Sequence, residues 1–232
     1  MTPRERLIVA LDVADARAAL ALVDKLAGRV GMFKVGTQLF TATGPELVRR
    51  LIEAGERIFL DLKYHDIPNT VAGAVRAADE LGVSLVDVHA LGGGPMIAAA
   101  SHALGSTGAR LIAVTLLTSH DQAGLEAIGI AGSPADAGLR LARLAQSAGA
   151  QGVVTSPHEV EGIRRACGPG FLIVTPGIRP SGAEPGDQAR FATPSAALKS
   201  GADFMVVGRP ILAAPDPAAA VEAIVQELEA AV

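Results

Sequence analysis

The sequence predicts a single-domain (β/α)8 TIM barrel that spans residues 1–232. Short runs of β-branched or apolar residues recur eight times, and each is followed by a stretch with helical periodicity. Near-continuous apolar strands that alternate with amphipathic helices are typical of parallel βαβ units. Eight units of about 29 residues each fit a barrel near the lower end of its usual size. An open doubly wound sheet is the alternative architecture.

The expected strands are rich in Val, Ile, Leu, Phe and Met, as suits strands that are buried on both faces of a parallel sheet. No linker, low-complexity tract or shift in composition divides the chain, so all eight are expected to belong to one domain. In chain order the strands are Leu7–Leu11, Met32–Val35, Ile58–Leu62, Leu85–His89, Leu111–Leu116, Gly152–Thr155, Leu172–Thr175 and Phe204–Val207.

Signals for helix starts and helix ends fall between these strands. Asp15 is well placed to cap the first helix, and Pro45 follows Gly44 at the start of another. Ser156-Pro157-His158-Glu159 has the pattern of a capping box with proline at the first helical position, and Thr193 precedes Pro194 in the same way. Four glycines stand where helices should end before the next strand, namely Gly55, Gly82, Gly149 and Gly201.

Composition excludes several classes of partner. The net charge is −4, with one tyrosine and no tryptophan, so the basic surface and stacking aromatics of a nucleic-acid binder are missing. The single cysteine, Cys167, cannot form an internal disulfide, which fits a reducing compartment. The apolar run before Asp12 has only five residues, too few for a signal peptide, and no later run approaches membrane-spanning length. We therefore expect a cytoplasmic protein with no nucleic-acid or membrane partner.

Three charges stand where the third strand should run out, at Asp61, Lys63 and Asp66. Charged side chains are rarely buried without a partner or a function. Side chains two residues apart share a face of a strand, so Asp61 and Lys63 are expected side by side. A structural ion pair is the alternative, although it brings no obvious gain in stability. Asp66 has an alternative role as the N-cap of the helix that follows.

Other strands also carry polar residues at their ends. Lys34 interrupts the apolar second strand, where a structural partnership with Asp61 is the alternative to a function. Asp12 follows the first strand, and Thr118 follows the fifth. Because the active sites of (β/α)8 barrels lie at the C-terminal ends of the strands, these side chains are expected to converge.

The loops after the last two strands are candidates for a phosphate site. One contains Gly177 and Arg179, and the other contains Gly208 and Arg209. Barrels often bind phosphate in these loops. Glycine lets an anion approach the backbone, and arginine neutralises its charge. Two surface arginines that occur there by chance are the alternative. The stretch 179–188, poor in apolar residues, is expected to form a lid loop.

Six motifs together resemble the orotidine 5′-phosphate decarboxylase family from the first expected strand to the last. The Asp-x-Lys-x-x-Asp pattern is shared with a wider barrel superfamily. Its continuation through residues 64–70 and the two phosphate loops resemble this family in particular. The motifs are Ala10-Leu11-Asp12, Phe33-Lys34-Val35-Gly36, Phe59-Leu60-Asp61-Leu62-Lys63-Tyr64-His65-Asp66-Ile67-Pro68-Asn69-Thr70, Thr115-Leu116-Leu117-Thr118-Ser119, Thr175-Pro176-Gly177-Ile178-Arg179 and Val207-Gly208-Arg209-Pro210.

The resemblance implies conversion of orotidine 5′-phosphate to UMP and CO₂, the last step of pyrimidine synthesis, with no metal and no organic cofactor. It implies that Lys63 protonates C6 of the pyrimidine. It also implies that Lys34, Asp61, Lys63 and Asp66 form an alternating charge network. In the family, the residues matching Asp66 and Thr70 reach into the neighbouring subunit's site, so a homodimer with shared sites is expected.

The resemblance also assigns residues to parts of the substrate. Asp12 and Lys34 would hold ribose hydroxyls, Asp61 would lie beside the departing carboxylate, and Thr118 would meet the pyrimidine. The phosphate would be held by Gln188 on the lid, Arg179, Gly208 and Arg209.

Two other functions fit the sequence less well. The first resembles 3-keto-gulonate 6-phosphate decarboxylase, a barrel enzyme that uses Mg²⁺ and places an acid on its second strand. Lys34 stands there in this chain, and a cation would repel the metal. The second is a catalytically silent phosphoribosyl-binding protein, which would have no need to bury Asp61, Lys63 and Asp66.

Overall fold

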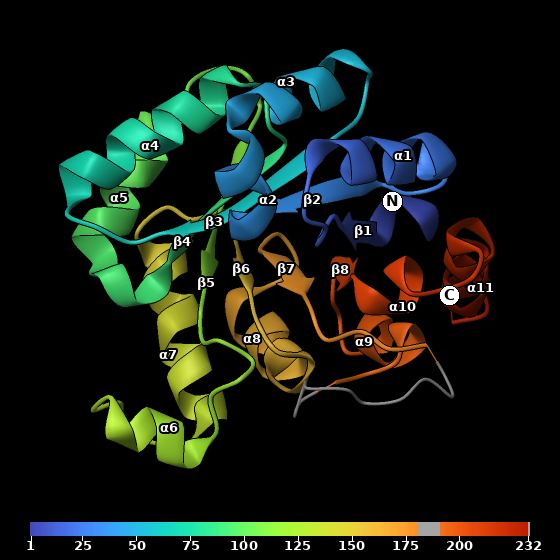
Figure 1. Ribbon diagram of the computed structural model, residues 1–232. Coiled ribbons are helices and arrows are strands. Elements are labelled where there is room, and N and C mark those ends of the chain that lie inside the picture. The colour runs from blue at the N-terminus through green and yellow to red at the C-terminus, as the bar shows by residue number, and fades with distance from the viewer. Residues whose placement is uncertain (181–190, 232) are drawn as a thin grey trace.

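The computed structural model describes residues 1–180 and 191–231. In these residues eight parallel strands close into one barrel, and the last strand pairs with the first. Figure 1 shows the helices on the outside of this barrel. The predicted (β/α)8 fold is confirmed, and the open doubly wound sheet is wrong. The strands are β1 Leu7–Ala10, β2 Met32–Gly36, β3 Ile58–Tyr64, β4 Leu85–His89, β5 Arg110–Val114, β6 Gly152–Val154, β7 Leu172–Thr175 and β8 Phe204–Val207.

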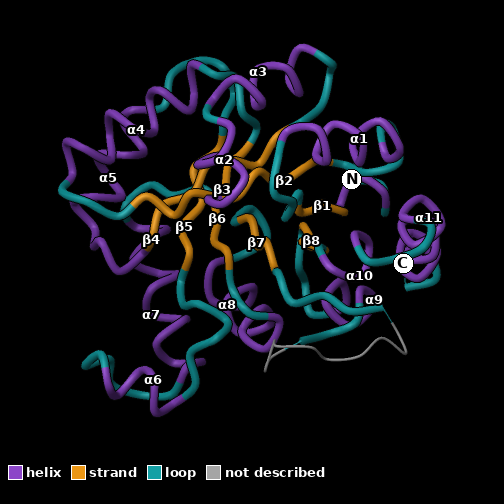
Figure 2. Tube along the Cα trace, viewed as in Figure 1, coloured by secondary structure: helices purple, strands orange, loops and turns teal. Residues whose placement is uncertain are grey.

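Helices follow the strands around the barrel, and Figure 2 shows the strands at the centre of the molecule within them. No helix of the described ranges is long and apolar enough to cross a lipid bilayer. The helices are α1 Ala16–Leu26, α2 Thr37–Thr43, α3 Pro45–Glu53, α4 Pro68–Glu80, α5 Gly93–Ala103, α6 Gln122–Ala127, α7 Pro134–Ser147, α8 Val160–Cys167, α9 Pro194–Lys199, α10 Arg209–Leu212 and α11 Pro217–Glu229.

The capping signals in the sequence act as predicted. Asp15 accepts a hydrogen bond from the backbone N–H of Ala18 at 2.8 Å and so begins α1. Ser156 and Glu159 form a reciprocal capping box ahead of α8. The four predicted helix-ending glycines all adopt positive φ angles, from 85° at Gly82 to 101° at Gly201, where a Cβ would be strained.

Side chains alternate between the barrel interior and the layer that contacts the helices. On β1, Ile8 and Ala10 pack in an interior cluster, whereas Leu7 and Val9 pack in the larger outer core. Met32 and Phe59 belong to the same interior cluster. Because the alternation has a period of two, the residues two positions further along, Lys34 on β2 and Asp61 on β3, also face the interior. The apolar interior thus ends in charged residues at the C-terminal mouth.

Candidate active site

A pocket of about 250 Å³ opens at the C-terminal ends of the strands. Its floor includes interior residues of the barrel, among them Ala10, Phe59, Val154 and Val206. Eight of the predicted site residues line it, namely Asp12, Lys34, Asp61, Lys63, Thr118, Arg179, Gly208 and Arg209. This volume is slightly below the roughly 300–1,000 Å³ that is usual for small-molecule sites.

Three predicted residues are not among those that line the pocket. Asp66 and Thr70 are exposed and lie outside it. Gln188 lies outside the described residues. The alternative role for Asp66 is wrong, because the N-cap of α4 is Ile67. The Asp66 carboxylate instead accepts a hydrogen bond from the backbone N–H of Ile67, at 2.6 Å.

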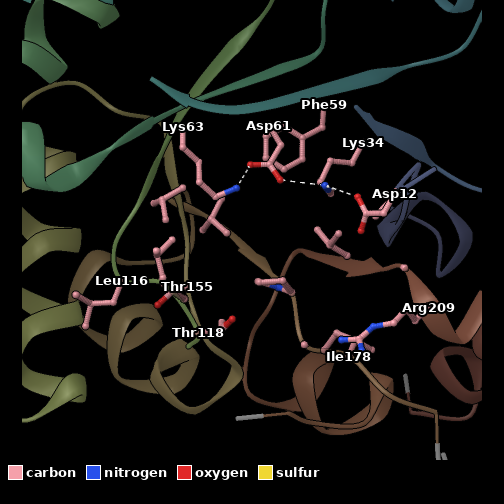
Figure 3. A pocket seen from close by; sticks show the side chains of 18 of the residues that line it. Asp12, Lys34, Phe59, Asp61, Lys63, Leu116, Thr118, Thr155, Ile178 and Arg209 are labelled. Carbon is pink, nitrogen blue, oxygen red and sulfur yellow. Dashed lines mark hydrogen bonds and ion pairs between the residues drawn. The ribbon is translucent and has the colours of Figure 1, made fainter. Parts of the chain in front are cut away.

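Four charges alternate in sign along one wall of the pocket, in the order Asp12, Lys34, Asp61, Lys63 (Figure 3). The Nζ of Lys34 lies 3.2 Å from Oδ1 of Asp12 and 3.1 Å from Oδ2 of Asp61. The other carboxylate oxygen of Asp61 accepts a hydrogen bond from the ammonium of Lys63. The two central groups are buried, and the side chain of Lys63 keeps 36% of its surface exposed toward the opening. One chain therefore supplies a continuous array of four charges.

Each central charge is maintained by its neighbours despite its burial. Burial alone would raise the pKa of Asp61, but Lys34, the neighbouring carboxyl group of Asp87 and Lys63 overcome it and lower that pKa to about 2. Burial alone would lower the pKa of Lys34, but the carboxylates of Asp61 and Asp12 raise it above its usual value. Asp61 and Lys34 are therefore both charged at neutral pH.

Two glycines leave room for this array. A Cβ on Gly36 would lie 3.0 Å from the Nζ of Lys34, and a Cβ on Gly208 would lie 3.3 Å from Oδ2 of Asp12. A side chain at either position would crowd a charged group, so the close packing of the array depends on glycine there.

Lys63 reaches the array through a local irregularity of β3. The pairing of β3 with β4 shifts register between Leu60 and Tyr64. Within this bulge Lys63 has a φ of 50°, the only positive φ of a non-glycine residue in the described ranges. The prediction that Asp61 and Lys63 are neighbours assumed that side chains alternate regularly along the strand. The alternation stops at this bulge, but the two side chains are nevertheless in contact.

Arg209 faces the charge array from the other side of the pocket (Figure 3), and Arg179 lines the same pocket. Arg179 is only 6% exposed, and no hydrogen-bond partner for its Nε occurs among the described residues. Burial, together with the positive charge of Arg209, lowers the pKa of Arg179. Two guanidinium groups that are close enough to repel each other make this end of the pocket suited to an anion.

Two histidines near Lys63 form a pair. The rings of His65 and His89 stack at 5.6 Å between centroids. Burial, helped by the charges of His65 and Lys63, lowers the pKa of His89 to about 4, so its imidazole is neutral at pH 7. Across the described part of the chain, no group of three or more His, Cys, Asp or Glu side chains is arranged to hold a metal ion.

Asp87 is an acidic residue that the prediction from sequence did not include. It lies in the middle of β4, is fully buried, and accepts a hydrogen bond from the backbone N–H of Lys63 at 2.8 Å. The sequence does contain a signal, because Asp87 interrupts an apolar strand in the same way as Lys34 does. Thr155 was missed as well, although it lines the pocket and belongs to the expected sixth strand.

Comparison with known proteins supports the resemblance seen in the sequence. The model of the orotidine 5′-phosphate decarboxylase / HUMPS family matches residues 5–224. The chain is 58% identical over 228 residues to orotidine 5′-phosphate decarboxylase of Halorhodospira halophila, with 97% of each chain covered. It is 52% identical over 237 residues to that of Moorella thermoacetica, covering 99% of this chain and 94% of the other.

A solved structure agrees with these relatives. The crystal structure of orotidine 5′-phosphate decarboxylase from Lactobacillus acidophilus superposes with a TM-score of 0.85 at 40% identity, covering 96% of this chain and 98% of the other. The predicted resemblance and the enzyme class that it implied, a carboxy-lyase, are confirmed. This chain therefore belongs to the orotidine 5′-phosphate decarboxylase / HUMPS family.

Proposed function

We propose that the protein decarboxylates orotidine 5′-phosphate to UMP and CO₂ in pyrimidine biosynthesis, without a metal or an organic cofactor. The observation that carries this proposal is the pocket itself. Alternating charges from Asp12 to Lys63 line one wall, and the anion-binding arginines Arg179 and Arg209 lie across from them. A phosphorylated nucleoside presents complementary groups, with a phosphate at one end and a reacting carboxylate at the other.

The reaction needs fixed charges because it has no internal electron sink. Loss of CO₂ from C6 leaves an electron pair in the plane of the pyrimidine ring, where the ring π-system cannot delocalise it. Enzymes lower barriers by about 8–23 kcal/mol, mostly through preorganised electrostatics. The ammonium of Lys63, oriented by Asp61, would stabilise the developing carbanion. The same ammonium would then donate a proton to C6, which yields UMP.

Asp61 holds Lys63 and would lie beside the departing carboxylate. Its low pKa keeps it ionised at neutral pH, so it would repel the substrate carboxylate while the ammonium of Lys63 favours the carbanion. Lys34 stabilises Asp61 from the other side, at 3.1 Å. The array therefore favours the product charge distribution over that of the substrate.

The remaining residues would bind parts of the substrate that do not react. Arg179, Arg209 and the backbone at Gly208 would hold the phosphate, and Gln188, which lies outside the described residues, would add a contact. Asp12 and Lys34 would hold ribose hydroxyls, and Thr118 would contact the pyrimidine. Binding energy from the phosphate would orient the ring over Lys63 and so contribute to the rate at a distance.

We further infer that the working unit is a homodimer with shared sites. Asp66 and Thr70 are exposed and lie outside their own chain's pocket, so any contact that they make with substrate would occur in another subunit. Ile67, which follows Asp66 in the chain, is 67% exposed. Exposed apolar side chains of this kind are suited to burial in an interface between subunits.

Turnover by a lysine variant tests the proposal. Purified metal-free protein should consume orotidine 5′-phosphate, measured as loss of its absorbance, and Lys63→Ala should lose nearly all turnover while still binding UMP. Lys25→Ala, at an exposed lysine on α1, is the matched control and should keep wild-type activity. Full activity of the Lys63→Ala protein, or no turnover by the wild type, would contradict the proposal.

A further inference from the structure

Asp87 is a buried carboxyl group with no substrate contact in the proposed mechanism. It occupies the middle of β4 and has no exposed surface. The interior-facing Leu85 lies two positions before it, so the side chain of Asp87 points into the barrel beneath the pocket. Its Oδ1 accepts the hydrogen bond from the backbone N–H of Lys63, at 2.8 Å.

The backbone that this bond holds is unusual. Lys63 has a φ of 50°, in the left-handed region that residues with a side chain rarely adopt, and β3 slips register against β4 around it. Such a conformation persists only where the surrounding structure determines it. The bulge leaves the Lys63 N–H without a regular strand partner, and Asp87 supplies the acceptor.

We propose that Asp87 is a positioning residue, whose carboxyl oxygen holds the bulge of β3 in the conformation that aims the ammonium of Lys63 at Asp61 and the pocket. The inference rests on the proposed function, in which Lys63 is the proton donor. Asp87 itself is not among the residues that line the pocket.

The environment of Asp87 indicates what kind of group the role requires. Burial, reinforced by the nearby carboxylate of Asp61, raises the pKa of Asp87 well above its usual range, and Lys63 only partly opposes this. Its second oxygen has no hydrogen-bond partner within the described ranges. The position therefore needs one acceptor oxygen rather than a negative charge, and asparagine has that oxygen in the same place.

The test compares an isosteric variant with a truncated one. Asp87→Asn keeps the acceptor, so its kcat should stay within about threefold of wild type. Asp87→Ala removes it, and kcat should fall about a hundredfold, as expected for a reacting group displaced by roughly 1 Å. The KM for orotidine 5′-phosphate and the affinity for UMP should change less than about threefold in both, because the groups that bind the substrate are intact.

Asp79 provides a matched control. Like Asp87 it is a buried aspartate, 4% exposed, whose carboxylate accepts a backbone N–H, from Gly105 at 3.0 Å. It lies on α4, away from the pocket. Asp79→Ala should lower the melting temperature but leave the kcat of the folded protein unchanged, which separates general loss of stability from misplacement of Lys63.

Each outcome bears on the proposal. An Asp87→Ala protein that is folded and keeps kcat within threefold of wild type would overturn it, as would an Asp87→Asn protein that is as impaired as Asp87→Ala. If Asp87→Ala does not fold, Asp87→Leu fills the space without an acceptor and must show the same loss of kcat. A wild-type protein that fails to turn over orotidine 5′-phosphate refutes the proposed function instead, so the two failures are distinguishable.

Discussion

Replacement of Lys34 by methionine tests the electrostatic account of the site most directly. Methionine has a similar length and no charge, so the substitution removes the ammonium that lies 3.1 Å from Asp61 and 3.2 Å from Asp12. At an effective dielectric constant of about 20, the attraction lost between Lys34 and Asp61 is about 5 kcal/mol. Part of this is recovered, because Lys34 no longer has to be desolvated and Lys63 still contacts Asp61. We expect the free energy of unfolding at pH 7 to fall by about 3 kcal/mol.

The same account predicts how the stability of each protein changes with pH. In the wild type the pKa of Asp61 is about 2, below the 3.8 of an unperturbed carboxyl, so its ionisation stabilises the fold above pH 3.8 and that contribution is lost as the pH falls towards 2. Without Lys34, burial dominates and the pKa of Asp61 should rise above 3.8. Ionisation of Asp61 then destabilises the folded variant as the pH rises. The stability difference between the two proteins should be larger at pH 7 than at pH 5, because the destabilising ionisation of Asp61 in the variant is more complete at pH 7.

Urea unfolding of both proteins at pH 7 and pH 5 measures these differences without reference to activity. Lys25→Met, at an exposed lysine on α1, is the control and should change stability by less than about 0.5 kcal/mol. A loss below about 1 kcal/mol for Lys34→Met, or an equal loss at both pH values, would refute the view that Lys34 keeps Asp61 ionised.

Three further predictions concern the shared site, the cofactor and the buried histidine. Equal mixing of inactive Asp66→Asn and Lys63→Ala chains should restore about a quarter of wild-type activity, because half of randomly formed dimers have one intact site; no recovery in demonstrably mixed dimers contradicts a shared site. Dialysis against EDTA should leave activity unchanged, and a loss that Mg²⁺ restores would contradict a cofactor-free reaction. Because the pKa of His89 is about 4 when folded and 6.5 when unperturbed, the wild type should lose stability between pH 6.5 and 4, and His89→Asn should lose less. If the unfolding midpoint changes by the same amount between pH 7 and pH 5 in both proteins, this prediction is wrong.

Local patterns were sufficient to predict the elements of this fold. Strands such as Phe204–Val207 are short apolar runs that have to be buried on both faces, and Asp15 and Ser156 begin helices through contacts within a few residues. The ends of the strands were predicted less accurately, because a polar residue at the end of a strand can either continue the hydrogen-bonded pairing with the neighbouring strand or lie beyond it. The expected fifth strand, Leu111–Leu116, thus ends at Val114 in the structure, and the third continues to Tyr64.

The site was predictable where a charge breaks an apolar pattern. Lys34 and Asp61 stand out in the sequence because each occupies an interior position of a buried strand. Asp87 has the same signal but was missed, because its partner is the backbone of Lys63, twenty-four residues away, and no side-chain motif marks that contact.

By itself the sequence determined the barrel, its family and the residues that carry charge. Only the tertiary structure decided which of these charges meet. Contacts between strands depend on register and on closure of the barrel, which no local period encodes. That register brings Lys34 between Asp12 and Asp61. The bulge of β3 then turns Lys63 toward Asp61, in a conformation that a regular strand would not adopt.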